Sequence, residues 1–180
     1  ERQEDCDSGE WTDWQMAAIP IKSLGRELVD NMADMAHFGP IHYSKVKSFK
    51  NTMKGHKFVQ YMVGGHQILT EGDGGLITSV ATYEGPAYMT TTMTGLMDGH
   101  PMTTHLLVSH IPVDMHNFVI NFGVMMKKDP NVSEAGNKAM VEEYTEKNIE
   151  SFHQDVAIWN NKCIIDNPLR CDGDGPIHLV

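Results

Sequence analysis

The chain has 180 residues, of which 41% are hydrophobic and 21% are charged, the composition of an ordinary soluble globular protein. Its formal net charge of −10 argues against nucleic acid or an anionic membrane surface as partner. No apolar run approaches the roughly 18 residues of a membrane span. The acidic start is the reverse of a secretory or transit signal, and the scattered Cys6, Cys163 and Cys171 indicate reduced thiols. These features predict a cytoplasmic location.

The first elements follow from polarity and apolar spacing. The first ten residues are polar, and we expect a flexible N-terminal segment there, followed by one domain over residues 11–180. A helix is predicted over residues 24–37, with Ser23 as its N-cap. Its apolar stripe consists of Leu24, Leu28, Met32 and Met35. We expect Gly39-Pro40 to interrupt this helix, because proline lacks the amide donor and crowds the preceding turn.

The middle of the chain has the valine, isoleucine, threonine and tyrosine content typical of strands. Turns are expected at residues 71–75, 85–86 and 112–114. The predicted strands cover residues 58–70, 76–83, 87–93, 102–111 and 116–126. Because the connections are too short for crossover helices, these strands are expected to form an antiparallel sheet.

The last predicted element is a long helix. Residues 131–134 (Asn-Val-Ser-Glu) have the spacing of a capping box and predict a helix that reaches about residue 161. Its inward stripe is expected to contain Met140, Tyr144, Ile149, Phe152, Val156 and Trp159. The sequence therefore predicts an α+β domain in which this helix lies across an antiparallel sheet.

Asp155 breaks the apolar face of that helix. It stands three residues after Phe152 and four before Trp159, so its carboxylate is expected to face the interior. A carboxylate there needs a cation, hydrogen-bond donors or a metal ion. The ordinary alternative is a helix-edge aspartate that reaches solvent or pairs with a lysine.

A second group of polar residues lies around the Gly39-Pro40 dipeptide. Asp30, Asp34 and His37 have the spacing of one helix face. His37 and His42 would diverge by about 140° on an ideal helix. We expect the break at Gly39-Pro40 to let the second imidazole swing back. Asp34 can accept the proton of the imidazole nitrogen that is not used for metal binding.

Two histidines and one remote carboxylate form the facial triad that holds non-haem Fe(II) and leaves coordination positions open for dioxygen. His37, His42 and Asp155 are therefore the candidate metal ligands, and Asp34 is the candidate partner of His37. The alternative is two structural histidines beside a helix end.

The pattern Asp30-Asn31-x-x-Asp34-x-x-His37-x4-His42 resembles the mononuclear-iron motif of the Rieske non-haem iron oxygenases, in their terminal oxygenase component. The resemblance runs from Thr12 to the C-terminus and is nearest to the 3-ketosteroid 9α-hydroxylase branch. The matching segments are Tyr43, Phe49-Lys50-Asn51, Gly55-His56, residues 83–89, residues 154–162, Asn167-Pro168-Leu169 and Asp174-Gly175-Pro176.

The resemblance implies a helix-grip catalytic domain in which His37, His42 and Asp155 hold a mononuclear Fe(II). Asp34 would be the catalytic bridging aspartate, which links the iron site to the Rieske cluster of a neighbouring subunit in a homotrimer. None of the three cysteines stands in the Cys-x-His or Cys-x2-His pairs that hold such a cluster. The two-iron two-sulfur cluster is therefore expected on another domain or chain.

The function implied by the resemblance is hydroxylation of a bulky hydrophobic small molecule, with a 3-ketosteroid as the candidate. Dioxygen would be the co-substrate, and electrons would come from a Rieske domain or from a ferredoxin and its reductase. A non-catalytic binder of hydrophobic ligands and an aromatic O-demethylase of the same superfamily are the alternatives. The methionines at 93, 97, 102, 125 and 126 suit either a core or a steroid-sized pocket.

Overall fold

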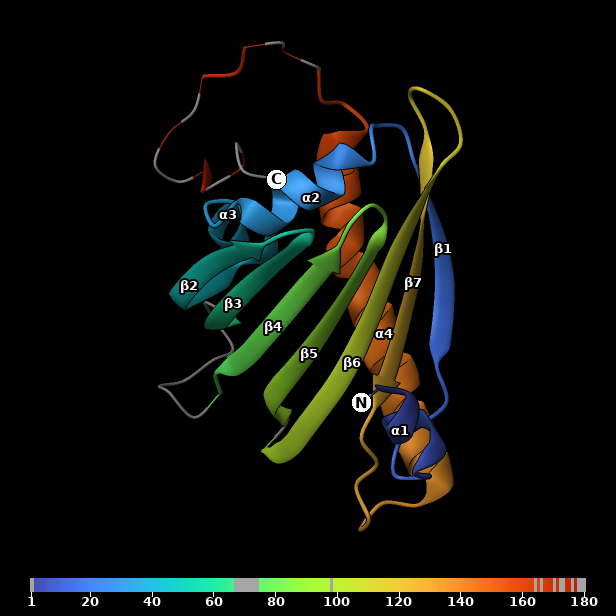
Figure 1. The fold of residues 1–180 in the computed structure, drawn as a ribbon. Coiled ribbons are helices and arrows are strands. Elements are labelled where there is room, and N and C mark those ends of the chain that lie inside the picture. Colours follow the sequence, from blue (N-terminus) through green and yellow to red (C-terminus); the bar gives the residue numbers. More distant parts are fainter. Residues whose placement is uncertain are drawn as a thin grey trace.

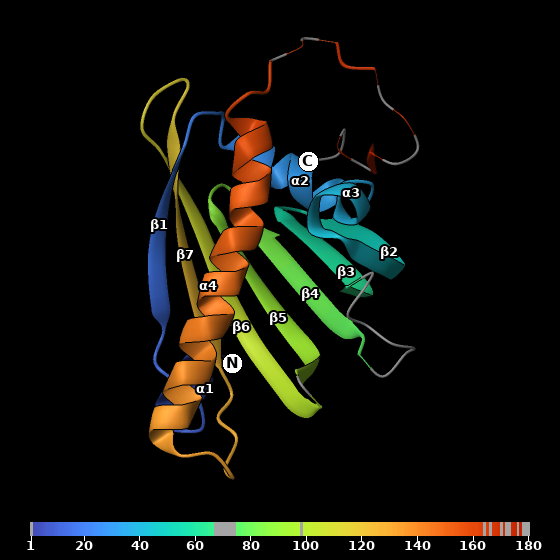
Figure 2. The ribbon, with the colours of Figure 1, turned by 180° about the vertical axis from the view of Figure 1, so that it is seen from behind.

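A long helix lies across one face of an antiparallel sheet in the computed structural model (Figures 1 and 2). The structure describes residues 2–66, 75–97 and 99–163, and in the C-terminal segment residues 165, 167–169, 171, 174, 175 and 177. Within this part of the chain, seven strands form one sheet of order β1-β7-β6-β5-β4-β3-β2. This architecture confirms the predicted α+β class.

The strands are β1 (Gln15–Ile21), β2 (Ser44–Lys54), β3 (Lys57–His66), β4 (Ile77–Glu84), β5 (Tyr88–Met97), β6 (His100–Pro112) and β7 (Phe118–Met126). The five predicted strands correspond to β3 through β7. The predicted strand over residues 58–70 ends in residues 67–70, and these, with residues 71–74 of the predicted turn, lie outside the described residues. The hydropathy pattern does not predict β1 and β2. Both are edge strands, and β2 carries the alternating lysines typical of an edge.

The core lies between β7 and the helix α4 (Glu134–Trp159). On β7, Phe118, Ile120, Phe122 and Val124 are almost completely buried. The predicted inward stripe of α4 is confirmed, because all six of its residues are buried or packed against this core. The ring centroids of Phe122 and Phe152 lie 5.0 Å apart. This packing fixes α4, and with it Asp155, against the sheet.

The start of α4 differs from the predicted capping box. Its N-cap is Ser133, whose Oγ accepts a hydrogen bond from the amide of Gly136 at 3.1 Å. Asn131 instead donates from its amide to Asp129 Oδ1. The helix therefore begins two residues later than an Asn131 cap would place it.

The predicted helix over residues 24–37 is shorter in the structure. Helix α2 spans Arg26–Ala33, its N-cap is Gly25 rather than Ser23, and Asp34 ends it in an extended conformation. Gly39 and Pro40 do not break a helix, because they lie in the first turn of α3 (Phe38–His42). The first-turn amides of a helix have no intrahelical acceptor, so a proline there loses no bond.

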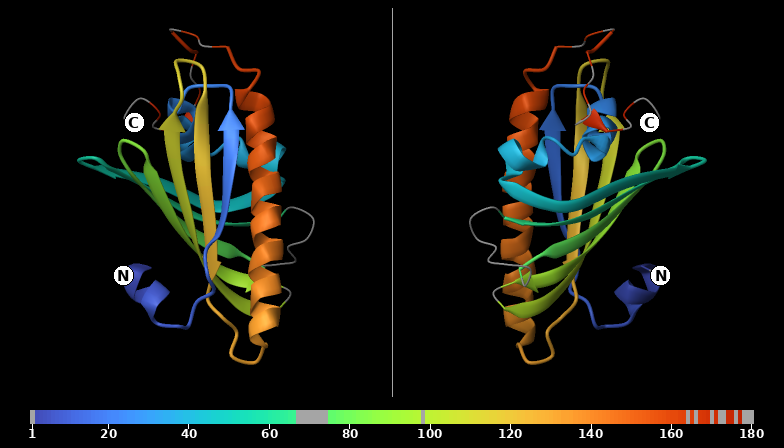
Figure 3. Two further views of the ribbon diagram at one scale, coloured as in Figure 1. Left: turned by 90° about the vertical axis from the view of Figure 1, so that its right-hand side faces the viewer. Right: turned by 90° about the vertical axis from the view of Figure 1, so that its left-hand side faces the viewer.

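The N-terminal residues form the short helix α1 (Arg2–Asp7), on the face of the sheet opposite α4 (Figure 3). Asp5 Oδ2 lies 2.9 Å from Nε2 of His105, a buried residue of β6 whose ring stacks on Trp11. Side-chain contacts therefore attach α1 to the sheet. Among the described residues, no helix is long and apolar enough to cross a membrane.

Candidate metal centre

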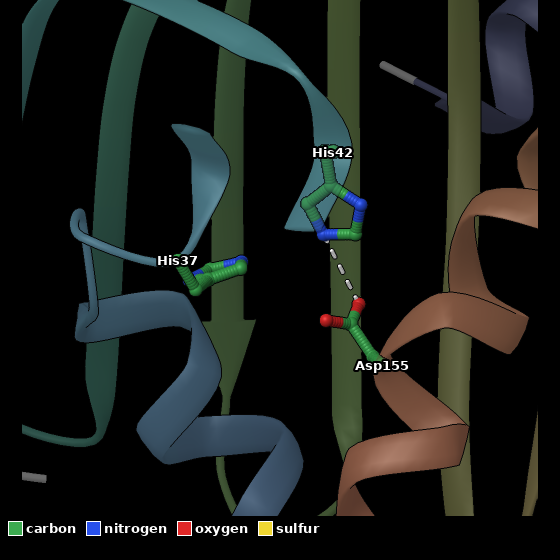
Figure 4. A group of neighbouring side chains, drawn as sticks. All are labelled: His37, His42 and Asp155. Carbon is green, nitrogen blue, oxygen red and sulfur yellow. Dashed lines mark ion pairs between the residues drawn. The ribbon is translucent and has the colours of Figure 1, made fainter. Parts of the chain in front are cut away.

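His37, His42 and Asp155 meet at one point between α3 and α4 (Figure 4). One potential ligand atom from each residue lies within 4.8 Å of those from the other two. His42 Nε2 is 3.3 Å from Asp155 Oδ2. The two imidazole rings have centroids 5.2 Å apart and planes at 80°. Side chains that are far apart in the sequence thus form one compact group of two nitrogens and a carboxylate.

The end of α2 is fixed by side chains from the sheet. The last carbonyls of a helix have no intrahelical donor, and here Gln60 Nε2 donates to Met32 O while Asn51 Nδ2 donates to Ala33 O at 3.1 Å. Asp34 Oδ1 then accepts from the amide of Ala36 at 2.7 Å, which turns the chain into α3. His37 is the N-cap of α3 and His42 is its last residue.

The predicted break between the two histidines is wrong, because His37 has helical backbone angles and α3 is continuous to His42. The imidazoles nevertheless lie in edge contact. The predicted shared face of Asp30, Asp34 and His37 is also wrong, because α2 ends at Ala33. Asp30 pairs with Arg26 instead, at 3.4 Å.

His37 is oriented by Asp34. Its Nδ1 lies 3.4 Å from Asp34 Oδ2, and this buried nitrogen has no hydrogen-bond partner among the described residues. Burial raises the pKa of Asp34, but the His37 imidazole that faces it and the hydrogen bond from the Ala36 amide outweigh this effect and leave that pKa lowered. Asp34 therefore stays a carboxylate that faces the imidazole.

His42 is oriented by two residues of α4. Its Nδ1 lies 3.0 Å from Gln154 Oε1 and 3.1 Å from Ser151 Oγ. Burial lowers the pKa of His42, but the hydrogen bond and charge of Asp155, with Gln154, outweigh it and raise that pKa above its ordinary 6.5. Sequence reasoning assigned a role to neither residue. The available signal was their spacing, since Ser151, Gln154 and Asp155 stand at i, i+3 and i+4 on α4.

A cavity of about 380 Å³ adjoins the three side chains. Its walls come from α2, α3, α4 and the sheet and are mainly apolar, with Leu28, Met32, Met62, Met89, Met93 and Leu106 among them. The predicted methionine set divides, because Met93 lines the cavity while Met102, Met125 and Met126 are buried in the core. The side chain of Met97 lies outside the described residues. The volume falls in the usual range for small-molecule sites.

The donor set fits a mononuclear non-haem iron. Ligands at about 2.1 Å from one ion lie about 3 Å apart when adjacent and about 4 Å apart when opposite. The 3.3 Å between His42 and Asp155 matches an adjacent pair. The three ligands of a facial triad are all adjacent to one another, so the other ligand atoms, which lie within 4.8 Å, would need to approach by up to about 1.8 Å. The same three residues line the apolar cavity, so coordination positions that they leave open would face it.

Comparison with known proteins identifies one family for the whole chain. The family model of the 3-ketosteroid 9α-hydroxylase C-terminal domain matches residues 1–180. The oxygenase component of a 3-ketosteroid-9-alpha-monooxygenase from Rhodococcus rhodochrous is 41% identical over 178 residues, which are 95% of this chain and 46% of that protein. The corresponding component from Mycobacterium tuberculosis is 34% identical over 179 residues, 96% of this chain and 46% of that protein. The chain spans about half the length of these relatives.

Solved structures show the same fold at low sequence identity. A mutant of NdmA from Pseudomonas putida CBB5, solved with caffeine, has a TM-score of 0.63 and 11% identity, covering 92% of this chain and 47% of that one. A quaternary ammonium Rieske monooxygenase has a TM-score of 0.58 and 14% identity, covering 89% of this chain and 42% of that one. The predicted helix-grip fold, an antiparallel sheet with a long C-terminal helix, is therefore confirmed.

Proposed function

The chain belongs to the 3-ketosteroid 9α-hydroxylase C-terminal domain family, and from this premise we propose that it is the catalytic domain of a Rieske-type oxygenase. The reaction is the hydroxylation of a bulky hydrophobic substrate with dioxygen. The observation that carries the proposal is the convergence of His37, His42 and Asp155 on the wall of an apolar cavity. A carrier of hydrophobic ligands would need the cavity but not a buried carboxylate beside two imidazoles.

The three residues have distinct roles in the proposal. His42 would bind Fe(II) through Nε2, the nitrogen that faces Asp155, and Asp155 would bind through its carboxylate. His37 would use Nε2, because its Nδ1 faces Asp34. When bound, Fe(II) supplies the site at which dioxygen binds and is reduced. The protein keeps the site dry on one side, since Asp155 is only 5% exposed.

Asp34 would connect the site to the source of electrons. Its lowered pKa keeps it a carboxylate, able to accept a hydrogen bond from His37 Nδ1. Its side chain is 26% exposed, so a group on another domain could reach it while it still contacts His37. In the proposed assembly, a homotrimer, that group belongs to the Rieske cluster of a neighbouring subunit, which receives electrons from a ferredoxin or reductase.

The proposed substrate class is the 3-ketosteroids. Both relatives described above are named as oxygenase components of 3-ketosteroid-9-alpha-monooxygenases. The cavity is mainly apolar and has a suitable size for such a substrate. Thr91 and Asn148 are among the polar groups in its walls and could orient the substrate by hydrogen bonds.

Turnover by a protein that contains both this domain and its Rieske cluster tests the proposal. With ¹⁸O₂, a supplied electron donor and a 3-ketosteroid, we expect a hydroxylated product that carries one labelled oxygen atom. Asp155→Ala should abolish the product while steroid binding persists. A protein that binds the steroid unchanged, holds no iron and forms no labelled product would instead be the carrier.

A further inference from the structure

The two histidines of the candidate centre are held by different chemistry. His37 Nδ1 faces the carboxylate of Asp34. His42 Nδ1 faces two neutral groups, the Gln154 amide oxygen at 3.0 Å and the Ser151 hydroxyl at 3.1 Å. The difference matters because the partner of the outer nitrogen determines which nitrogen of a neutral imidazole carries the hydrogen.

The contacts on the two sides of the His42 ring favour different tautomers. Gln154 Oε1 can only accept a hydrogen bond, so it favours a hydrogen on Nδ1. Asp155 Oδ2, 3.3 Å from Nε2, also accepts and favours a hydrogen on Nε2. In the second tautomer Nε2 would donate to Asp155 and would have no lone pair to present to a metal ion.

We propose that Gln154 and Ser151 are positioning residues that hold His42 in the Nδ1–H tautomer and so leave Nε2 free to bind the metal. The proposal rests on the function proposed above. Ser151 supports Gln154, because its hydroxyl oxygen can accept the same hydrogen from a second direction.

The backbone of α4 brings these groups together. Ser151, Gln154 and Asp155 lie on successive turns of α4, and the adjacent Val156 and Trp159 are buried in the core. One helix thus supplies both the carboxylate ligand and the groups that orient the histidine beside it. A neutral acceptor at position 154 also avoids a second negative charge next to Asp155, which would favour a protonated imidazole in competition with the metal.

The tautomer of His42 can be measured without metal. Long-range ¹H–¹⁵N NMR spectra of the metal-free chain, recorded above the pKa of His42, should show Nδ1 protonated and Nε2 unprotonated in the wild type. The double variant Gln154→Leu/Ser151→Ala should shift the hydrogen to Nε2, and its Fe(II) affinity should fall about 10- to 100-fold. Glu150→Leu, at an exposed position of the same helix, is the matched control and should keep wild-type values for both.

The variant Gln154→Glu should keep the Nδ1–H tautomer, because a carboxylate also accepts a hydrogen bond there. Protonation of Nε2 in neutral wild-type His42 would overturn the proposal, as would a double variant that keeps Nδ1–H. Loss of iron without a change of tautomer would also overturn it, since the residues would then be structural. A wild-type chain that binds no Fe(II) would refute the proposed function, while the NMR spectra would still decide the tautomer.

Discussion

Ala81→Phe would place an aromatic ring in the cavity, and its effect can be estimated from the structure. Ala81 is buried on β4 and lines the cavity opposite the helices. The substitution adds six carbon atoms, roughly 100 Å³ at protein packing density, against a cavity of about 380 Å³. Excluding one ring of a bulky ligand would leave on the order of 80 Å² of its apolar surface unburied, about 2 kcal/mol. Steroid affinity should therefore fall about 30-fold.

The assay is equilibrium binding of a 3-ketosteroid to the Fe(II)-loaded chain, with Fe(II) affinity measured in parallel. The iron ligands lie on α3 and α4 rather than on β4, so Fe(II) affinity should not change. Val80→Phe is the matched control, because adjacent residues of a strand face opposite sides of the sheet. Wild-type steroid affinity in a folded Ala81→Phe variant would refute the assignment of the cavity as the binding site.

Three further predictions concern the backbone next to Asp34, the protonation of His42 and the N-cap of α4. At Gly175, which has φ +63°, an added Cβ would lie 2.1 Å from Ala33 O, just before Asp34. Gly175→Ala should therefore lower the free energy of unfolding by about 1–3 kcal/mol in denaturant titrations and weaken Fe(II) binding. Because the pKa of His42 is raised, Fe(II) affinity should fall as the pH is lowered through that pKa, measured by competition with a chelator. In the metal-free chain the His42–Asp155 pair has the opposite dependence: its stabilisation is complete below pH 6.5 and is lost as the pH rises through the raised pKa. Ser133→Ala should lower the free energy of unfolding by about 1 kcal/mol without affecting Fe(II) affinity.

The part of the fold that the sequence predicts is the part governed by local patterns. Strands β3 through β7 and helix α4 have the apolar periodicities that burial on a sheet or a helix face requires. Strand β2 is missed because an edge strand needs little apolar surface. The end of α2 is missed because Asn51 and Gln60, on distant strands, provide the donors for its last carbonyls. Contacts between remote residues are not visible in a local pattern.

In the candidate site, too, local patterns predict some features, and contacts between remote residues determine the others. Two features of the sequence, an aspartate on an apolar helix face and a pair of closely spaced histidines, were enough to predict that His37, His42 and Asp155 form one site. The path of the backbone between the histidines was wrong, because Pro40 fits the first turn of a helix as well as it ends one. Gln154 stands in a segment that matches the family but received no role, because a glutamine beside a buried aspartate has many ordinary explanations; only the 3.0 Å contact with His42 gives it one.

The most direct test of the account is the iron content of the chain. After anaerobic reconstitution and removal of excess metal, the wild type should retain close to one Fe(II) per chain. The variants His37→Ala, His42→Ala and Asp155→Ala should each lose most of this iron. The control His153→Ala, at an exposed position of α4 near Asp155, should retain it. Stoichiometric iron in all three ligand variants, or none in the wild type, would contradict the assignment of a mononuclear iron centre.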